Sequence, residues 1–343
     1  MRRREIKRVL LEELGDWISG ETLAESLGVS RAAVWKQVQS LRAEGYDIEA
    51  SKRGYRLGSV PDLLSEDLVG WGLKTRFVGR TIFIFPSLTS TNAEAKSIAA
   101  SAEEGTVIVS EVQTSGRGRM ERPWLSPPGG VWMSIILKPR IHPSLASRVN
   151  IAAAVAAARA LESLYGLEVR IKWPNDLLVG EKKICGILTE MGAEMDQLEY
   201  AVVGIGINAN LDPDLLPKEW GATSISGELD REVLRAQLIG RVLEEVERAC
   251  EEVDGPFEGL LEEWSLRSGT LGRRVRITTR SGEFEGVAEA LEDDGALVVR
   301  RDDGDMVRVF AGDCIHLRAG AEQANGVSVD SRRLGHGSGV GYL

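Results

Sequence analysis

The chain has 343 residues, of which 43% are hydrophobic and 27% are charged, and its formal net charge is -10. This composition excludes an intrinsically disordered chain, and the length predicts two or three globular domains. The negative charge argues against nucleic-acid binding by the whole surface but is compatible with a local basic patch. The three cysteines lie far apart without a CxxC pair, which excludes a disulfide framework and a cysteine zinc site and favours the reducing cytoplasm.

We expect neither a membrane partner nor a metal site. Glu12 interrupts the N-terminal segment before a signal-peptide apolar region develops, and the longest apolar run, residues 151–158, is too short to span a membrane. His142, His316 and His336 are isolated from one another and from acidic clusters, so we assign them no chemistry.

Residues 5–44 predict three short helices. Apolar stripes contain Ile6, Val9, Leu10 and Leu14 in the first helix, and Leu23, Ala24 and Leu27 in the second. A glycine turn follows, Ser30 is a natural N-cap for the third helix, and Val34, Val38 and Leu41 should face inward. Two helices joined by such a turn form a helix-turn-helix pattern.

Residues 46–48 and 55–57 flank a basic tip and predict a hairpin, which makes the N-terminal module a winged variant. Residues 1–60 contain 11 Lys+Arg against 9 Asp+Glu, so the basic balance is local. Arg42 of the third predicted helix and Arg56 of the predicted hairpin are among these basic residues. The alternatives are DNA binding and a helical interaction domain with solvated basic side chains. For DNA binding the candidate residues are Ser30, Arg31, Ala32, Lys36, Lys52 and Arg53.

A connector that contains proline precedes a longer α+β region. Strands are predicted at residues 81–85, 106–111, 132–137, 169–173, 184–190 and 201–207, and helices at 92–102, 145–165 and 231–253. Short alternating runs between residues 269 and 318 predict a small antiparallel β-barrel. We therefore predict an α+β multidomain protein: a winged helix-turn-helix (1–60), a central mixed α/β domain (61–267), the barrel (268–318) and a disordered tail (319–343).

The loop GRGRMERPW, residues 116–124, places three arginines and a tryptophan among glycines that oppose a regular element, and it predicts an anionic ligand. Phosphate-loop, HExxH and GxSxG motifs are absent. The GxG in residues 202–208 lacks a third glycine and a following helix, so a buried strand that ends at a site is favoured over a dinucleotide fingerprint.

Four segments combine strand ends with polar residues: residues 90–92, Gln113 with the arginine loop, KWPND at 172–176, and Asn208. Each alone has an ordinary explanation as a helix cap or a turn. In this order and at these spacings they resemble the biotin-protein ligase family. With the winged module in front, the chain resembles the bifunctional members, the biotin operon repressors, from Arg4 to Arg318.

This resemblance implies a class II synthetase-like catalytic domain with biotin, ATP and Mg²⁺ as cofactors or substrates. Biotin and MgATP would give biotinyl-5′-AMP and pyrophosphate, and biotin would then pass to one lysine of a biotin carboxyl-carrier protein domain. The implied partners also include operator DNA, with the adenylate as corepressor, and a second copy of the chain, through a homodimer that forms on ligand binding.

The resemblance also implies roles for individual residues. Lys172 and Arg119 would be catalytic, and Asp176 would either handle the incoming lysine or only hold its loop. The biotin set is Ser90, Thr91, Asn92, Gln113, Gly116, Arg117, Lys172 and Gly186. The ATP and adenylate set is Arg119, Arg122, Trp124, Asn175, Lys183, Asn208 and Trp220, although the segment around Trp220 could equally be an ordinary surface loop.

Two departures from the family pattern concern ATP affinity. Glu121 stands where glycine is usual and should repel phosphate unless it points outward or pairs with Arg122, and Glu181 stands where a small residue is commoner. The alternatives are a lipoate-type ligase, which the arginine loop and KWPND disfavour, and a ligand-sensing transcription factor without transfer activity, which the presence of Lys172 disfavours.

Overall fold

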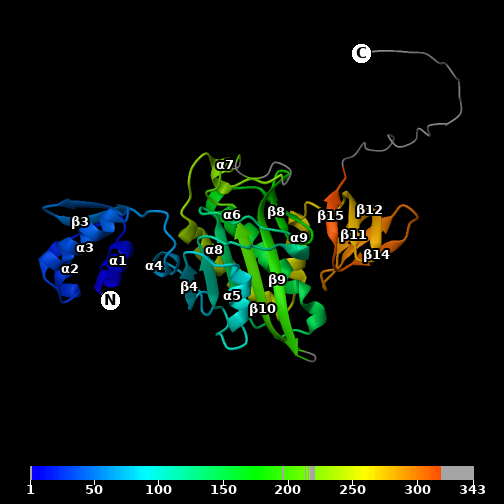
Figure 1. Ribbon diagram of the computed structural model, residues 1–343, viewed down its shortest axis with the longest axis horizontal. Coiled ribbons are helices and arrows are strands. Elements are labelled where there is room, and N and C mark those ends of the chain that lie inside the picture. Colours follow the sequence, from blue (N-terminus) through cyan, green and yellow to red (C-terminus); the bar gives the residue numbers. More distant parts are fainter. Residues whose placement is uncertain (1, 195–196, 213, 215, 217–220, 318–343) are drawn as a thin grey trace, which may run out of the picture.

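Three β-sheets follow one another along the chain in the computed structural model, which describes residues 2–194, 197–212, 214, 216 and 221–317. The small N-terminal sheet and the C-terminal sheet lie at opposite ends of the long axis, and the large sheet lies between them (Figure 1). The predicted tail, residues 319–343, lies outside the described residues, and the predicted domain boundaries remain predictions.

The structure of the N-terminal module confirms the three predicted helices and the hairpin. Its elements are α1 (Arg2–Glu12), β1 (Trp17–Ile18), α2 (Gly20–Ser26), α3 (Arg31–Ala43), β2 (Asp47–Ser51) and β3 (Gly54–Ser59), with strand order β1-β3-β2. Val34, Val38 and Leu41 are buried as predicted. The prediction for Leu14 was wrong: α1 ends at Glu12, so Leu14 is exposed, and Leu11 joins Ile6 and Leu10 in the core instead.

Two of the basic side chains serve the module itself. Arg42 Nε donates to Ile48 O at 2.7 Å, and Arg56 pairs with Glu49 at 2.6 Å. The six DNA-contact candidates, in contrast, are all exposed: Ser30, Arg31, Ala32, Lys36, Lys52 and Arg53. Ser30 Oγ accepts from Ala33 N at 3.2 Å, which confirms it as the N-cap of α3.

The central sheet has seven strands in the order β4-β5-β6-β10-β9-β8-β7, with β4 and β5 parallel and the other pairs antiparallel. The strands are β4 (Ile82–Phe85), β5 (Val107–Ser110), β6 (Val131–Leu137), β7 (Val169–Lys172), β8 (Asp176–Val179), β9 (Lys182–Glu194) and β10 (Gln197–Ile207). The sequence did not predict β8, because KWPND turns directly into this strand as a hairpin.

Helices cover both faces of this sheet (Figure 1). On one face Ala95 of α5 (Thr91–Ile98) and Ala99, the C-cap of this helix, pack against Ile108, Ile136 and Val202. On the other face α6 (Ser147–Tyr165), α8 (Arg235–Val253) and α9 (Glu258–Arg267) pack against alternate residues of the same strands. The short helices α4 (Glu66–Val69), α7 (Ile225–Leu229) and also α9 were not predicted, and α5 and α8 are shorter than predicted.

The C-terminal sheet is antiparallel, as predicted, with strand order β14-β13-β12-β11-β15. Its strands are β11 (Arg274–Thr279), β12 (Gly282–Leu291), β13 (Leu297–Arg301), β14 (Met306–Val309) and β15 (Asp313–His316). The outermost strands are β14 and β15, and β15 was not predicted. Within the described part of the chain, no helix combines the length and the apolar content that a membrane crossing requires.

Candidate functional site

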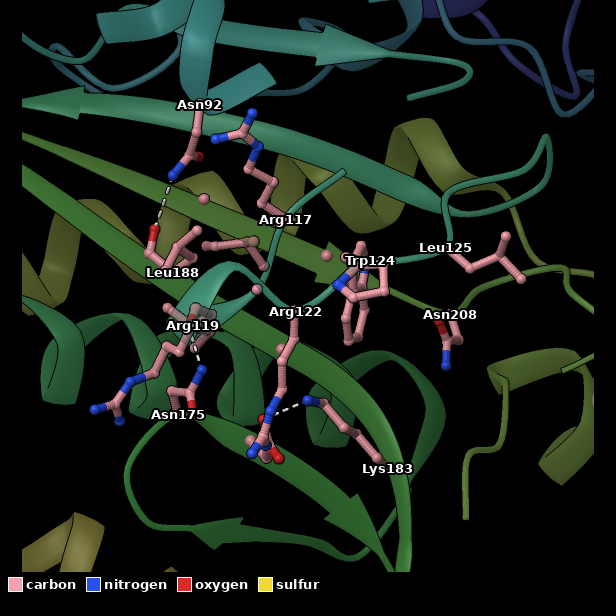
Figure 2. A pocket seen from close by; sticks show the side chains of 18 of the residues that line it. Asn92, Arg117, Arg119, Arg122, Trp124, Leu125, Asn175, Lys183, Leu188 and Asn208 are labelled. Carbon is pink, nitrogen blue, oxygen red and sulfur yellow. Dashed lines mark hydrogen bonds and ion pairs between the residues drawn. The ribbon is translucent and has the colours of Figure 1, made fainter. Parts of the chain in front are cut away.

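A cavity of about 450 Å³ opens on the face of the central sheet that α5 covers, over β6, β10 and β9 (Figure 2). Most of the predicted site residues line it: Ser90, Thr91, Asn92, Gln113, Arg117, Arg119, Arg122, Trp124, Lys172, Asn175, Asp176, Lys183, Gly186 and Asn208. Gly116 of the arginine loop is not among the lining residues, and Trp220 lies outside the described residues. Segments that are far apart in sequence therefore meet at one cavity.

Glycines create the floor of this cavity. Gly204 and Gly206 alternate along β10 with Val203, Ile205 and Ile207, whose side chains enter the core on the opposite face. Gly186 of β9 lies beside Gly206 in the sheet. A side chain at Gly206 would displace the Trp124 ring, because its Cβ would lie 2.6 Å from Trp124 Nε1, and a Cβ at Gly186 would make a tight contact of 3.1 Å with the same ring.

Trp124 is an indole seated on these glycines. Its ring meets Trp132 edge to face at 6.4 Å between centroids, and Lys183 Nζ lies 4.8 Å from the ring centroid. Trp124 Nε1 is buried and has no hydrogen-bond partner among the described residues. The sequence did not identify Trp132, which fixes the ring position, because a tryptophan in an apolar strand looks like ordinary core.

A network of neutral polar groups lies at the α5 end. Thr91 N and Oγ1 donate to Gln113 Oε1 at 2.8 and 3.1 Å, and Gln113 Nε2 donates to Ser126 Oγ at 2.8 Å. Ser134, fully buried in β6, donates to Thr91 Oγ1 at 2.8 Å or to Asn92 Oδ1 at 2.7 Å. The network presents hydrogen-bonding groups of fixed orientation to the cavity.

Asn92 is held by the protein itself. Its Nδ2 donates to Leu188 O at 3.2 Å and to Glu190 Oε2 at 2.9 Å, and Figure 2 shows the Leu188 contact. Lys96 pairs with the other oxygen of Glu190 at 2.7 Å. Since the Asn92 amide already uses both of its donor hydrogens, its geometry suits positioning of the helix start. Ser134 and Glu190 were not predicted from the sequence.

The arginine loop is a compact turn. Gly118 N donates to Arg122 O at 2.7 Å, and Trp124 N donates to Gly116 O at 2.8 Å. A Cβ at Gly116 would lie 2.4 Å from Trp124 O, so only glycine allows this close approach. Met120 and Glu121 have φ values of 53° and 58°, a left-handed conformation that favours glycine. This geometry is a physical reason for the usual glycine at position 121.

The departures at Glu121 and Glu181 are both neutralised by arginines. Glu121 is 78% exposed and pairs with Arg117 at 2.8 Å, not with Arg122. Glu181 is also exposed and receives two hydrogen bonds from Arg273, which hold the pKa of its carboxyl below the usual value. Neither carboxylate lines the cavity.

The cations around the cavity differ in how far they are neutralised. Arg122 pairs with Asp313, and Lys183 pairs with Asp176 at 2.5 Å. Arg119 and Lys172 have no ion-pair partner among the described residues, and burial lowers the pKa of Arg119, with Asp313 and Asp176 opposing this effect. The cavity therefore offers two cations free to receive an anion.

Several hydrogen bonds hold the KWPND hairpin, which positions Lys172. Lys172 and Asp176 face each other across the β7–β8 pair. Asn175 Nδ2 donates to Ile187 O at 2.7 Å, and Asn150 Nδ2 donates to Pro174 O at 2.8 Å. Trp173 N donates to Thr270 Oγ1 at 3.0 Å, so the segment before the C-terminal sheet also supports the hairpin.

The C-terminal sheet supplies part of the cavity wall, which the sequence did not predict. Asp313, Cys314 and Ile315 of β15 line the cavity together with residues of the central sheet. His316 follows them and lies 3.0 Å from Thr270 Oγ1. Burial first, and then the charges of Lys172 and Arg273, lower the pKa of His316 to about 4.

At the Asn208 end, a buried arginine joins the site to Asp62, which lies in the connector between β3 and α4. Asn208 Nδ2 donates to Thr223 O at 2.8 Å. Two residues later, Asn210 N donates to Gly129 O at 2.7 Å and Asn210 Nδ2 to Asp62 Oδ2 at 2.9 Å. Arg235, 5% exposed, pairs with Asp62 and Glu111, both at 2.6 Å. Burial would lower the pKa of Arg235, but Glu111 and Asp62 raise it.

Comparisons with known proteins match this architecture. The model of the Biotin/lipoate A/B protein ligase family matches residues 82–208, an HTH domain model matches residues 2–56, and the Biotin protein ligase C terminal domain matches residues 270–317. The solved structure of biotin protein ligase from Aquifex aeolicus in complex with biotin and ATP is 24% identical, covers 70% of this chain and 100% of that one, and has a TM-score of 0.61. This likeness shows a shared fold.

Curated relatives extend the match over nearly the whole chain. The Bifunctional ligase/repressor BirA of Bacillus subtilis is 38% identical over 320 residues, 91% of this chain and 97% of that protein. The protein of the same name from Escherichia coli is 29% identical over 92% of this chain and 97% of that protein. The chain therefore belongs to the biotin protein ligase family, in the group of bifunctional ligase/repressors with an N-terminal helix-turn-helix domain.

Proposed function

We propose that the chain activates biotin with ATP to biotinyl-5′-AMP and transfers the biotinyl group to a lysine of a carrier protein. The observation that supports this most directly is the order of polar and charged side chains along the cavity. Figure 2 shows Asn92 and Asn208 far apart across the cavity, with Arg119, Arg122 and Lys183 along one side. A molecule with a neutral heterocycle, a central carboxyl-phosphate group and a purine fits this order of groups.

The chemistry requires no covalent enzyme nucleophile. A carboxylate oxygen of biotin attacks the α-phosphorus of ATP, and the bond to the bridging oxygen of the β-phosphate breaks to release pyrophosphate. The amine of the acceptor lysine then attacks the acyl carbon, AMP leaves, and the nitrogen loses a proton as the amide forms. Positioning and charge stabilisation are the main contributions that the protein makes to such a reaction.

We assign the roles by position in the cavity. Ser90, Thr91 and Gln113 hold the ureido ring, with Arg117 and Gly116 closing the loop over it. Lys172 and Arg119, the free cations, stabilise the carboxylate oxygen and the α-phosphate. Trp124 and Asn208 contact the nucleotide side, and a phosphate would compete with Asp313 for Arg122. Asp176, paired with Lys183, serves to orient Lys183 in this arrangement.

Magnesium would enter with ATP. Among the described residues, no cluster of three or more His, Cys, Asp or Glu side chains could hold a metal ion. The nearby carboxylates Asp176 and Asp313 are each paired with a cation. This donor set suits a magnesium ion that is bound mainly by the substrate phosphates, as is usual for this ion, and a dedicated protein cage is not part of our proposal.

A mass-based assay tests the ligase function. The full chain at micromolar concentration is incubated with MgATP, a carrier domain and either biotin or lipoate. We expect pyrophosphate release and a biotin-sized mass gain on the carrier, with little gain from lipoate. A lipoate-sized mass gain instead would assign the chain to the lipoate branch. If neither product formed, the ligase function would be rejected and only the ligand-sensing alternative would remain.

We also propose that the adenylate is the corepressor of a repressor of biotin synthesis genes. One winged module makes few phosphate contacts and should bind DNA at only about 10⁻⁴ to 10⁻⁶ M, so specific binding needs two copies. Ordering of the loops by the adenylate would favour a homodimer that presents two modules to a palindromic operator. The proposal also includes a cytoplasmic location for the protein and a competition between binding of the carrier protein and formation of the homodimer.

A gel shift at fixed salt tests the repressor function. The probe is DNA upstream of the biotin synthesis genes, with and without biotin plus ATP. We expect tighter binding with the ligands, and Arg31→Ala, Lys36→Ala or Arg53→Ala should weaken it while biotin transfer is unchanged. Equal binding in both conditions would reject the corepressor mechanism.

A further inference from the structure

Trp35 of α3 is a large apolar side chain that the fold leaves in solvent. It is 58% exposed, whereas Val34 and Val38 of the same helix are completely buried. It makes no hydrogen bond or ring contact among the residues that the structure describes. Trp17 of the same module, in contrast, lies under Arg53 and Arg56, whose guanidinium carbons are 5.5 and 5.0 Å from its ring. The module therefore leaves more than half of the Trp35 surface free.

The neighbours of Trp35 on the helix are the predicted DNA contacts. Arg31 lies four residues before it and Lys36 directly follows it, and both are exposed and without an ion-pair partner in the described part of the chain. Ala32, three residues before it, is also exposed and has only a methyl side chain. Since Ser30 caps α3, Trp35 stands within the first turns of the helix, the part of a recognition helix that contacts base edges.

The major groove presents one apolar group, the C5-methyl of thymine, and its other features are hydrogen-bond donors and acceptors. Insertion of apolar wedges between base steps is characteristic of minor-groove proteins, whereas a recognition helix lies in the major groove. Cations on both sides of the indole favour DNA as the occupant over a neutral protein surface. We propose that Trp35 packs on a thymine methyl and makes the operator thymine-specific at that position.

This inference rests on the proposed DNA-binding function and adds a base preference to it. Deoxyuridine tests it directly, because it keeps every hydrogen-bonding group of thymine and lacks only the methyl. Loss of one buried methyl-sized group corresponds to about a fourfold loss of affinity. A phosphate contact, in contrast, is insensitive to this replacement.

The experiment uses the full chain with biotin and MgATP. A random-sequence duplex library is enriched for binding, and each thymine of the selected site is then replaced singly by deoxyuridine. We expect at least one thymine whose replacement weakens binding about fourfold. In Trp35→Ala the same replacement should change affinity less than 1.5-fold, and Trp35→Phe should restore part of the discrimination.

Two controls separate this role from general DNA binding and from folding. Lys36→Ala should weaken binding to thymine and deoxyuridine sites equally, and all variants should retain biotin transfer. Two results would overturn the inference about Trp35 and leave the DNA-binding function in place. One is a selected site in which no thymine is sensitive to loss of its methyl, and the other is a Trp35→Ala variant that loses as much affinity on deoxyuridine replacement as the wild-type chain. Failure of the wild-type chain to enrich any sequence would overturn the DNA-binding function together with it.

Discussion

Arg235 is the buried cation whose removal should cost the most stability. Replacement by methionine keeps much of the apolar volume but leaves Asp62 and Glu111 without their shared partner. Breaking a buried ion pair costs about 3–5 kcal/mol. Because the side chains of Asp62 and Glu111 are 19% and 31% exposed, water can partly replace the guanidinium, so we expect the lower end, about 3 kcal/mol.

Urea unfolding followed by tryptophan fluorescence measures this loss. With a slope of about 3 kcal/mol per molar urea, the midpoint of Arg235→Met should fall by about 1 M. Arg170→Met is the matched control, because Arg170 also pairs with a glutamate at 2.6 Å, but both side chains are exposed. An exposed pair contributes about 0–1 kcal/mol, so this midpoint should move by less than about 0.3 M.

The same variant tests whether the cluster supports the nucleotide end of the site. Asp62 also accepts from Asn210, and Glu111 accepts from Gly129 N at 3.3 Å, so loss of Arg235 loosens the segments next to Asn208 and before Trp132. The KM for ATP should therefore rise more than the KM for biotin. Equal midpoints for Arg235→Met and Arg170→Met would refute the reasoning about burial, and an unchanged KM for ATP would refute the link to the site.

Four further predictions concern the site. Lys172→Ala should lower adenylate formation roughly 100-fold, as for loss of one charge-stabilising donor, and a loss below about threefold in single-turnover assays would remove it from the chemistry. Gly206→Ala should displace Trp124 and raise the KM for ATP, while its unfolding midpoint checks that the sheet persists. Gly116→Ser should speed biotin dissociation and release adenylate to hydrolysis, measured as AMP without carrier labelling, and amide exchange at residues 115–122 should slow on ligand binding. Because the folded pKa of His316 is about 4 against an ordinary 6.5, its contribution to stability is complete above pH 6.5 and is lost as the pH falls toward 4; His316→Asn should flatten this dependence in unfolding measurements.

The sequence predicted those features that depend on local spacing. The positions of Val34, Val38 and Leu41 fixed the buried side of α3, and Ser30 fixed its start. The cavity residues were identified from the resemblance to the biotin-protein ligase family. The spacing within residues 90–92 or 172–176 does not by itself indicate that these segments meet. That meeting depends on the order of strands in the sheet, which local pattern does not encode.

The features that were missed have side chains whose role depends on a distant partner. Ser134 lies in an apolar strand and becomes part of the site only because α5 places Thr91 against it. Arg235 follows other charged residues and resembles a solvated side chain until Asp62 and Glu111 surround it. Asp313 begins the short strand β15, which carries no long alternating apolar run, and its contact with Arg122 spans 191 residues of sequence.

The alternation of β10 ties the binding site to the core. Gly204 and Gly206 face the cavity, and the residues that alternate with them, Val203, Ile205 and Ile207, face the helices on the other side. A one-residue shift of the strand would put these branched side chains under Trp124 and glycines into the core. The register that buries the core is therefore the same register that keeps the cavity open. A Cβ at Gly204 would lie 2.2 Å from Asn92 Oδ1, so the strand that binds the indole at one glycine also seats the start of α5 at the other.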